Sequence, residues 1–177
     1  LAEKFRIPVI VLADEIIGHM REKLTLPDPG EYEVFERVPP ECSRKDYLPK
    51  DSRKGDVPPM AAFGDGYRFH VTGLSHDDSG FPTQDPEAVQ RTLDRMENKI
   101  LRHRKEIELN EELFTDDCEI LVVSFGSTGR SAKAAVHRLR QRTKIRAGLL
   151  RPLTVWPFPS QRMRKLGENL KAVVVPE

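Results

Sequence analysis

The stretch that decides the fold reads EILVVSFGSTG and runs from Glu119 to Gly129. Its first seven residues are almost continuously apolar, which is typical of a strand buried on both faces of a sheet. The four residues Gly126–Gly129 then turn the chain, and apolar residues follow at i, i+3, i+4 and i+7: Ala132, Ala135, Val136 and Leu139. This spacing places them on one face of a helix, so the stretch predicts a buried strand followed by an amphipathic helix.

The alternation continues to the end of the sequence. Ile145–Leu150 is a second apolar run, Ser160 is a candidate N-cap for a helix reaching Leu170, and Ala172–Val175 is a third run. A βαβαβ order is typical of a parallel sheet with right-handed crossovers. The predicted fold class is therefore α/β, with a three-layer βαβ sandwich in the last third of the chain.

Two further pairs of elements are predicted upstream. Ile7–Leu12 has the pattern of a strand buried on both faces, and Asp14–Lys23 reads as a short helix, like the end of another α/β domain. Tyr67–Thr72 alternates like a strand, and Asp85-Pro86 begins a helix that is predicted to reach about Leu109.

Residues 26–63 are predicted to be a connector, because they contain seven prolines and show no apolar period. A loop of this length is uncommon inside a compact domain, so we expect an extended segment docked on a neighbouring surface. Disorder is the competing interpretation. The chain begins at Leu1 and stops directly after an apolar run, so the sequence is also expected to be a piece of a longer polypeptide.

Charge is distributed unevenly along the chain. Residues 1–119 carry 17 Lys+Arg and 26 Asp+Glu, a balance of −9, whereas residues 120–177 carry 12 and 2, a balance of +10. We expect a docking surface on the basic helix, at Arg138, Arg140, Arg142 and Lys144, either for the acidic N-terminal half of the chain or for a partner subunit. A solvated helix back is the competing interpretation, and nucleic-acid binding is disfavoured because no aromatic residues interleave with the basic ones.

The most promising candidate site is Gly126, Ser127, Thr128 and Gly129. A turn that leads from a parallel strand into a helix exposes N–H groups that favour anions, so these residues are candidates for an anion or interface contact. The turn matches neither GxGxxG nor GxxxxGK[ST], and a plain strand–helix turn remains the alternative.

Other reactive residues form no recognised constellation. His76-Asp77-Asp78 is either a base or ligand cluster or an exposed turn, and His19 is expected to be structural. Cys42 and Cys118 lack metal-ligand spacing. The sequence therefore predicts no catalytic, cofactor-binding or metal-binding residues among these 177 residues. No apolar run approaches about 20 residues and no signal pattern is present, which predicts a cytoplasmic protein with no membrane partner. No nucleic-acid partner is expected either, because the basic stretch lacks interleaved aromatic residues.

Three segments carry a resemblance to a known family. IPVIVLADEIIGHMRE (residues 7–22), GYRFHVTGLSHD (66–77) and LRPLTVWPFP (150–159) resemble the α subunit of 2-oxoacid:ferredoxin oxidoreductases, particularly the 2-oxoglutarate type. The resemblance covers essentially the whole chain. It implies that residues 1–25 end a pyrimidine-binding-type domain, 26–117 form a connector with a strand and a long helix, and 118–177 form a truncated transketolase C-terminal-like domain.

The resemblance also implies what the complete enzyme does. Members of this family decarboxylate a 2-oxoacid on thiamine diphosphate with Mg²⁺, pass electrons through iron–sulfur clusters to ferredoxin, and leave an acyl group on coenzyme A. The implied partners are a β subunit, with γ and δ subunits as further candidates, and ferredoxin. No cofactor is expected on this stretch itself. Two alternatives remain open: a nucleotide-binding regulatory domain and a basic nucleic-acid-binding module.

Overall fold

The computed structural model describes residues 1–176, apart from the side chain of Ser52. The chain forms two compact units. The first comprises residues 1–9 and 25–102, and the second comprises residues 10–24 and 103–177. No helix within the described residues is long and apolar enough to cross a membrane.

The second unit is built on a four-stranded sheet in the order β1-β3-β2-β4. Its strands are β1 (Asn110–Leu113), β2 (Ile120–Val123), β3 (Ala147–Pro152) and β4 (Ala172–Val174). Strand β2 pairs in parallel with both β3 and β4, whereas β1 pairs antiparallel with β3. The predicted parallel βαβαβ arrangement is confirmed, and β2 is one of its two inner strands.

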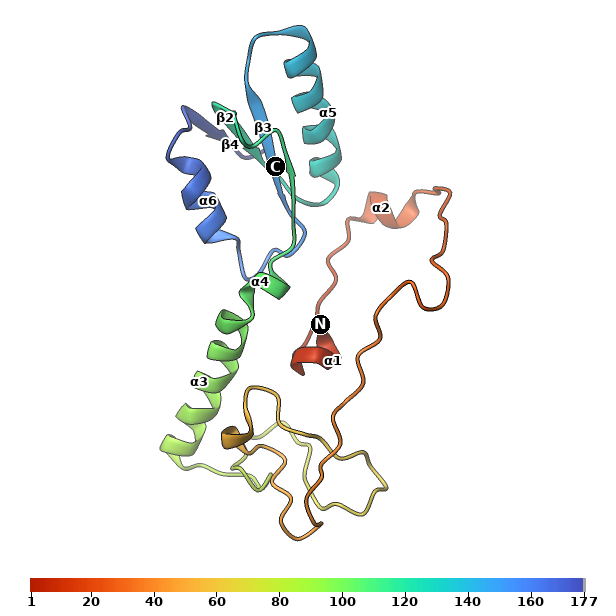
Figure 1. Ribbon diagram of the computed structural model, residues 1–177, viewed down its shortest axis with the longest axis vertical. Helices are drawn as coiled ribbons and strands as arrows, with labels where there is room; N and C mark the ends of the chain where they lie inside the picture. The colour runs from red at the N-terminus through yellow and green to blue at the C-terminus, as the bar shows by residue number, and fades with distance from the viewer. Residues whose placement is uncertain (177) are drawn as a thin grey trace. The chain divides into compact units, whose positions relative to one another are not determined.

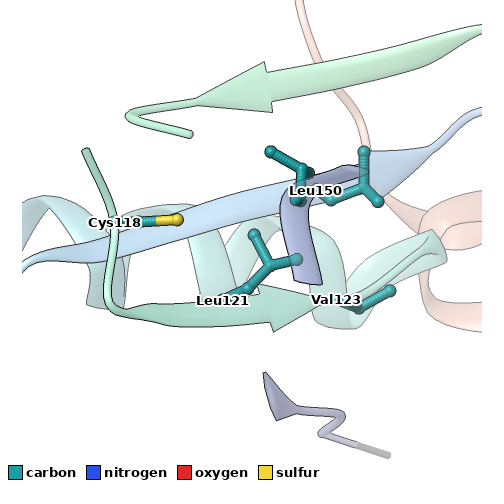
Figure 2. Packing of buried hydrophobic residues seen from close by; sticks show 5 residues of the cluster. Cys118, Leu121, Val123 and Leu150 are labelled. Carbon is teal, nitrogen blue, oxygen red and sulfur yellow. The ribbon is translucent and has the colours of Figure 1, made fainter. Parts of the chain in front are cut away.

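Two helices pack on opposite faces of this sheet, α5 (Gly126–Arg142) and α6 (Ser160–Gly167) (Figure 1). Alternate residues of a strand point to opposite faces. Accordingly, one buried cluster joins α6 to the sheet: Cys118, Leu121, Val123, Leu150 and Leu166 (Figure 2). A second cluster joins α5 to the other face: Ala132, Val136, Ala147 and Leu149. Ala135, predicted on the same apolar face of α5, is exposed instead.

Strand β1 was not predicted, because its sequence NEEL has no apolar period. It is held at the sheet edge by charge as well as by backbone pairing. Glu111 accepts hydrogen bonds from Lys133 of α5 and from Arg151, which lies directly opposite it in β3. Glu112 pairs with Arg162 of α6, with N–O distances of 2.5 and 2.7 Å.

The first unit contains α1 (Ala2–Phe5), η1 (Ser52–Lys54) and α3 (Pro86–Arg102). The predicted start of α3 is confirmed, since Asp85 caps it by accepting from the Ala88 N–H at 3.1 Å. The helix does not reach Leu109. It ends at Arg102, and after a turn at His103 a separate short helix follows, α4 (Arg104–Ile107).

The connector in the first unit folds around a buried tyrosine. Tyr47 is 7% exposed, accepts a hydrogen bond from the Ala61 N–H at 3.0 Å, and contacts Tyr67 and Phe69 edge to face. The predicted strand at Tyr67–Thr72 is wrong. Its aromatic side chains alternate inward as expected, but no neighbouring strand pairs with its backbone within the described residues, so it stays irregular.

The predicted strand at Ile7–Leu12 is also wrong in this structure. The segment is irregular, and Ile10, Val11 and Leu12 are 80, 85 and 72% exposed. A doubly buried strand needs a sheet neighbour on each side, and none of the described residues supplies one. The helix predicted over Asp14–Lys23 is shortened to α2 (Glu15–His19).

Candidate functional site: a carboxylate-binding turn

The four candidate residues Gly126–Gly129 form the first turn of α5 itself. Gly126 has a φ of 61°, the left-handed region that glycine adopts at little cost and that lets the chain leave β2 and enter the helix at once. The first N–H groups of a helix have no partner inside it and carry a partial positive charge. The turn is therefore chemically suited to an anion, as the sequence predicts.

The structure places a carboxylate of the same chain at this turn. The Ser127 N–H donates to Asp14 Oδ2 at 2.6 Å, across 113 residues of sequence and within the second unit. A methyl group at Gly126 would lie only 2.9 Å from the same oxygen, so glycine also makes room for the carboxylate. Hydrogen bonds from the Ser127 side chain and backbone lower the pKa of Asp14, which keeps it ionised.

A second carboxylate from the same segment binds one turn further along α5. Both terminal guanidinium nitrogens of Arg130 donate to the Glu22 carboxylate, at 2.7 and 3.3 Å. The Arg130 hydrogen bond lowers the pKa of Glu22, and Glu22 raises that of Arg130. Ser127 and Arg130 are three residues apart, so both contacts lie on one face of the helix.

The end of the turn is shaped by a close side-chain approach. Gly129 is buried, and a methyl group there would meet Arg151 Nε at 2.8 Å and Cδ at 3.1 Å. Glycine thus lets Arg151 pass beneath α5 to reach Glu111, at 2.9 Å. Arg151 Nε is buried without a hydrogen-bond partner among the described residues. Thr128 is half-buried in the same turn.

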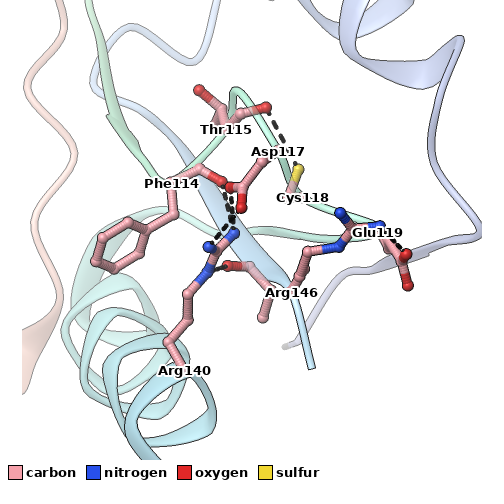
Figure 3. A network of polar contacts seen from close by, with 8 residues as sticks. Phe114, Thr115, Asp117, Cys118, Glu119, Arg140 and Arg146 are labelled. Carbon is pink, nitrogen blue, oxygen red and sulfur yellow. Dashed lines mark hydrogen bonds and ion pairs between the residues drawn. The ribbon is translucent and has the colours of Figure 1, made fainter. Parts of the chain in front are cut away.

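Of the four basic candidates, Arg140 has a role inside the unit. It donates to both carboxylate oxygens of Asp117, at 2.7 and 3.0 Å, and to the carbonyls of Ala147 and Phe114 (Figure 3). Its side chain is only 19% exposed, and its guanidinium lies 4.8 Å from the Phe114 ring centre. The Asp117 hydrogen bond raises the pKa of Arg140 and correspondingly lowers that of Asp117. Arg140 thus ties α5 to the start of β3 and to the loop before β2.

The other three candidates, Arg138, Arg142 and Lys144, are exposed at the end of α5 and in the loop that follows. Their exposure distinguishes them from the basic residues that pair with acids of β1 and the β1–β2 loop. Counted by compact unit, charge is also more even than along the sequence. The second unit has 16 Lys+Arg and 12 Asp+Glu, net +4, and the first has 13 and 16, net −3. Much of the basic excess therefore faces acids of its own unit.

The His76-Asp77-Asp78 cluster is a folded turn. His76 is 2% exposed, with Nε2 2.9 Å from Thr72 Oγ1 and Nδ1 3.2 Å from Lys50 Nζ. Burial, followed by the Lys50 charge, lowers the pKa of His76. Asp77 caps its own turn by accepting from the N–H groups of Ser79 and Phe81. A cavity of about 290 Å³ lies between this turn and α3.

The described residues do not fit a metal centre. Among residues 1–176, His, Cys, Asp and Glu side chains form no group of three or more that could hold a metal ion. Cys118 is buried, and burial raises the pKa of its thiol; Cys42 is half-buried, and neither cysteine is in a disulfide.

Two family models match the sequence. Residues 1–95 match the thiamine diphosphate-binding part of pyruvate flavodoxin/ferredoxin oxidoreductase, and residues 118–177 match pyruvate:ferredoxin oxidoreductase core domain II. Ile10–Leu24 thus belongs by sequence to the first match and by packing to the unit that contains the second.

Individual relatives agree with these matches. The chain is 43% identical to 2-oxoglutarate synthase subunit KorA of Methanothermobacter thermautotrophicus, over all of this chain and 46% of that protein. It is 33% identical to ketoisovalerate oxidoreductase subunit VorB of Methanothermobacter marburgensis, over 96% of this chain and 40% of that protein. The chain therefore spans about half the length of the curated relatives it matches.

A solved structure shares the fold. The 2-oxoglutarate:ferredoxin oxidoreductase of Magnetococcus marinus, determined with 2-oxoglutarate, coenzyme A and succinyl-CoA bound, aligns with a TM-score of 0.76. Its sequence identity is 23%, over 85% of this chain and 26% of that chain. This likeness shows the mixed α/β fold, and the family match over residues 1–95 covers more than half of the sequence. The chain therefore belongs to the pyruvate flavodoxin/ferredoxin oxidoreductase family.

Proposed function

We propose that this chain is part of the α subunit of a 2-oxoacid:ferredoxin oxidoreductase that acts on 2-oxoglutarate. The observation that carries the proposal is the 43% identity to a 2-oxoglutarate synthase subunit along the entire chain. Three 2-oxoglutarate synthase subunits match at 42–44% identity and a fourth at 33%, whereas the ketoisovalerate oxidoreductase subunits match at 32–33%. The three higher matches favour 2-oxoglutarate among the 2-oxoacids. The reaction would join the decarboxylated acyl group to coenzyme A and pass two electrons to ferredoxin.

Within this enzyme the chain would have a structural and interface role. Residues 1–25 would end the pyrimidine-binding-type domain, 26–117 would connect, and 118–177 would form a transketolase C-terminal-like domain. Thiamine diphosphate, Mg²⁺, iron–sulfur clusters and coenzyme A would be held mainly by other parts of a cytoplasmic complex. The β subunit would dock on the exposed basic residues Arg138, Arg142 and Lys144, whereas Arg140 would support the fold beneath them.

A nucleotide-binding regulatory role is less well supported by the site. A phosphate at the first turn of α5 would have to displace the Asp14 carboxylate from the Ser127 N–H, or lie beside it and be repelled. The intramolecular pairing of several basic side chains likewise leaves fewer free cations for nucleic acid than the sequence suggests.

The test is to purify the full-length subunit with its natural partners and identify them by mass spectrometry. The purified complex would then be assayed for coenzyme A-dependent dye reduction with 2-oxoglutarate, pyruvate or 2-oxoisovalerate. We expect the β subunit of the same thiamine diphosphate-dependent enzyme to co-purify. We also expect kcat/KM to be highest with 2-oxoglutarate. A preference for another oxoacid would overturn the substrate assignment, and no 2-oxoacid-dependent reduction would overturn the proposed function.

A further inference from the structure

The cavity of about 290 Å³ beside α3 lies entirely within the first unit, and the function proposed above does not use it. Its lining comes from α3, from the turn at residues 77–79 and from Leu48, all inside the family match over residues 1–95. Pockets for drug-sized ligands begin at about 300 Å³, so a cavity of this size suits a smaller molecule.

One wall of the cavity is basic. Arg91 and Arg95 are four residues apart, so they lie on one face of α3. Arg95 donates to a neutral acceptor, the Lys50 carbonyl oxygen, at 2.9 Å, and Arg91 lies 3.9 Å from Glu87 of its own helix, beyond hydrogen-bond distance. Burial, followed by the Arg95 charge, lowers the pKa values of Lys50 and Lys99. Positive charge at this wall is therefore concentrated and lacks a hydrogen-bonded carboxylate among the described residues.

The other wall of the cavity is acidic, because Asp77 and Asp78 line it. Asp77 shapes the turn by accepting at Oδ1 from the hydroxyl and N–H of Ser79 and from the Phe81 N–H. The Ser79 hydrogen bond lowers the pKa of Asp77, which keeps it ionised. Asp78 is exposed, and its carboxylate makes no hydrogen bond or ion pair within residues 1–176. Asp78 is thus an acid that the turn itself does not use.

The opposite charges of the two walls do not pair with each other. In the part of the chain that the structure describes, no ion pair joins Arg91 or Arg95 to either aspartate. An anion alone would be attracted by the arginines and repelled by Asp78, and a cation alone would experience the reverse. A ligand that carries both charges satisfies both walls, and Leu48 and Ala88 add an apolar lining.

We infer that this cavity binds a small zwitterion of the α-amino acid class. The ligand carboxylate binds the guanidinium groups of Arg91 and Arg95, which present planar pairs of donors. The ligand ammonium binds Asp78, and a short apolar side chain lies against Leu48 and Ala88. The inference does not rest on the proposed function, because every residue that carries it lies in the first unit.

Three probes of matched shape test whether both charges are needed. L-Valine carries both, isovalerate lacks the ammonium, and isobutylamine lacks the carboxylate. Titration calorimetry of the full-length subunit in its complex measures the affinity of each probe. Hydrogen–deuterium exchange of peptides covering residues 76–82 and 86–96 shows whether the probe binds at this cavity.

The variants are Arg91→Gln and Asp78→Asn, each of which removes one charge from an exposed side chain. Lys45→Gln and Glu97→Gln are the matched controls, because they remove exposed charges of the same signs from outside the cavity. Unchanged melting temperatures without ligand show that each variant is folded.

We expect L-valine to bind saturably and to slow exchange at both peptides, and each single-charge probe to bind about three- to tenfold more weakly. Arg91→Gln should weaken valine by a similar factor and leave isobutylamine unchanged. Asp78→Asn should weaken valine likewise and leave isovalerate unchanged.

The inference is overturned if valine slows exchange at neither peptide, or only elsewhere in the complex. It is also overturned if either single-charge probe binds as tightly as valine, or if the control variants weaken valine as much as the cavity variants do. None of these readouts requires turnover of a 2-oxoacid, so their failure is distinguishable from failure of the proposed function.

Discussion

At the residue scale, Arg140 illustrates how a side chain that reads as surface charge can be a structural element. Its exposed neighbour Arg138 has the same chemistry and lies on the same helix, but Arg140 reaches a carboxylate and two backbone carbonyls. The pattern of basic residues could not distinguish the two, because the partners Phe114, Asp117 and Ala147 come from other elements.

We therefore predict that Arg140→Ala lowers the free energy of unfolding by about 1–3 kcal/mol, the range for hydrogen bonds to charged groups. Arg140→Lys should recover only part of this loss, because an ammonium cannot reproduce the planar fork of donors. Arg138→Ala is the control and should change stability by less than about 0.5 kcal/mol. Urea unfolding of the full-length subunit measures all three, and equal effects of Arg138→Ala and Arg140→Ala would contradict the assignment.

Burial of His76 predicts that the stability of the protein depends on pH. Its pKa in the folded protein is lowered, first by burial and then by the Lys50 and His70 charges. The unfolded chain therefore binds a proton more readily, so the stability linked to His76 is full above pH about 6.5 and is lost as pH falls through the folded-state pKa. His76→Gln can keep a hydrogen bond to Thr72 without titrating. Between pH 7.5 and 5, the free energy of unfolding should fall more steeply with falling pH in the wild type than in His76→Gln. Identical slopes for the two proteins would contradict this role.

At the scale of elements, the sequence predicted those whose apolar pattern is satisfied within the chain. Strands β2, β3 and β4 are short apolar runs that pair with one another, and α5 covers one face of the sheet they form. Strand β1 was missed because pairing and ion pairs, not apolar periodicity, hold it. Ile7–Leu12 was wrong for the opposite reason, because its apolar pattern is strong but no described strand pairs with it.

The candidate site was predicted in part for the same physical reason. Gly126–Gly129 was recognised as suited to an anion because a strand–turn–helix signature is local in sequence. Its occupant, Asp14, lies 113 residues away, and no local pattern predicts a contact over that separation. The sequence thus indicated the chemistry of the turn but not its ligand.

Gly148 gives an element-scale prediction in β3. A methyl group there would lie 2.8 Å from the Phe114 carbonyl oxygen and 2.8 Å from Cys118 Cβ, and backbone cannot yield as a flexible side chain does. Gly148→Ala should therefore destabilise the protein by about 1–3 kcal/mol. Gly167→Ala, at the end of α6 with no atom within 4 Å of the added carbon, is the matched control. It should be neutral or stabilising, because alanine favours helix. Thermal unfolding compares the two, and equal melting temperatures would contradict the close packing at β3.

At the scale of the whole molecule, the balances of −9 and +10 along the sequence do not describe two opposed surfaces. The acid-rich residues 103–119 fold with the basic C-terminal stretch, so their charges meet inside one unit: Glu111 with Lys133, Asp117 with Arg140, and Glu119 with Arg146 and Lys171. The predicted docking surface is thus smaller than the sequence suggests, because of its four residues only Arg138, Arg142 and Lys144 are exposed.

This smaller surface gives a sharper test of docking than reversal of the whole basic helix, because Arg140 can be left in place. Arg138→Glu with Arg142→Glu should slow assembly with the partner subunit, most strongly at low salt. Exposed charges act mainly on encounter rate, and their range falls to about 10 Å at 0.1 M salt.

Arg164→Glu with Lys165→Glu on α6 is the control, because it changes net charge equally, at exposed positions on the opposite face of the sheet. If only net charge steers assembly, both double variants should slow it alike. A docking surface at the end of α5 requires the first variant to be the slower at low salt, with both converging on the wild-type rate as salt rises. Stopped-flow mixing of labelled subunits measures these rates, and an unchanged melting temperature for each variant separates loss of docking from loss of fold.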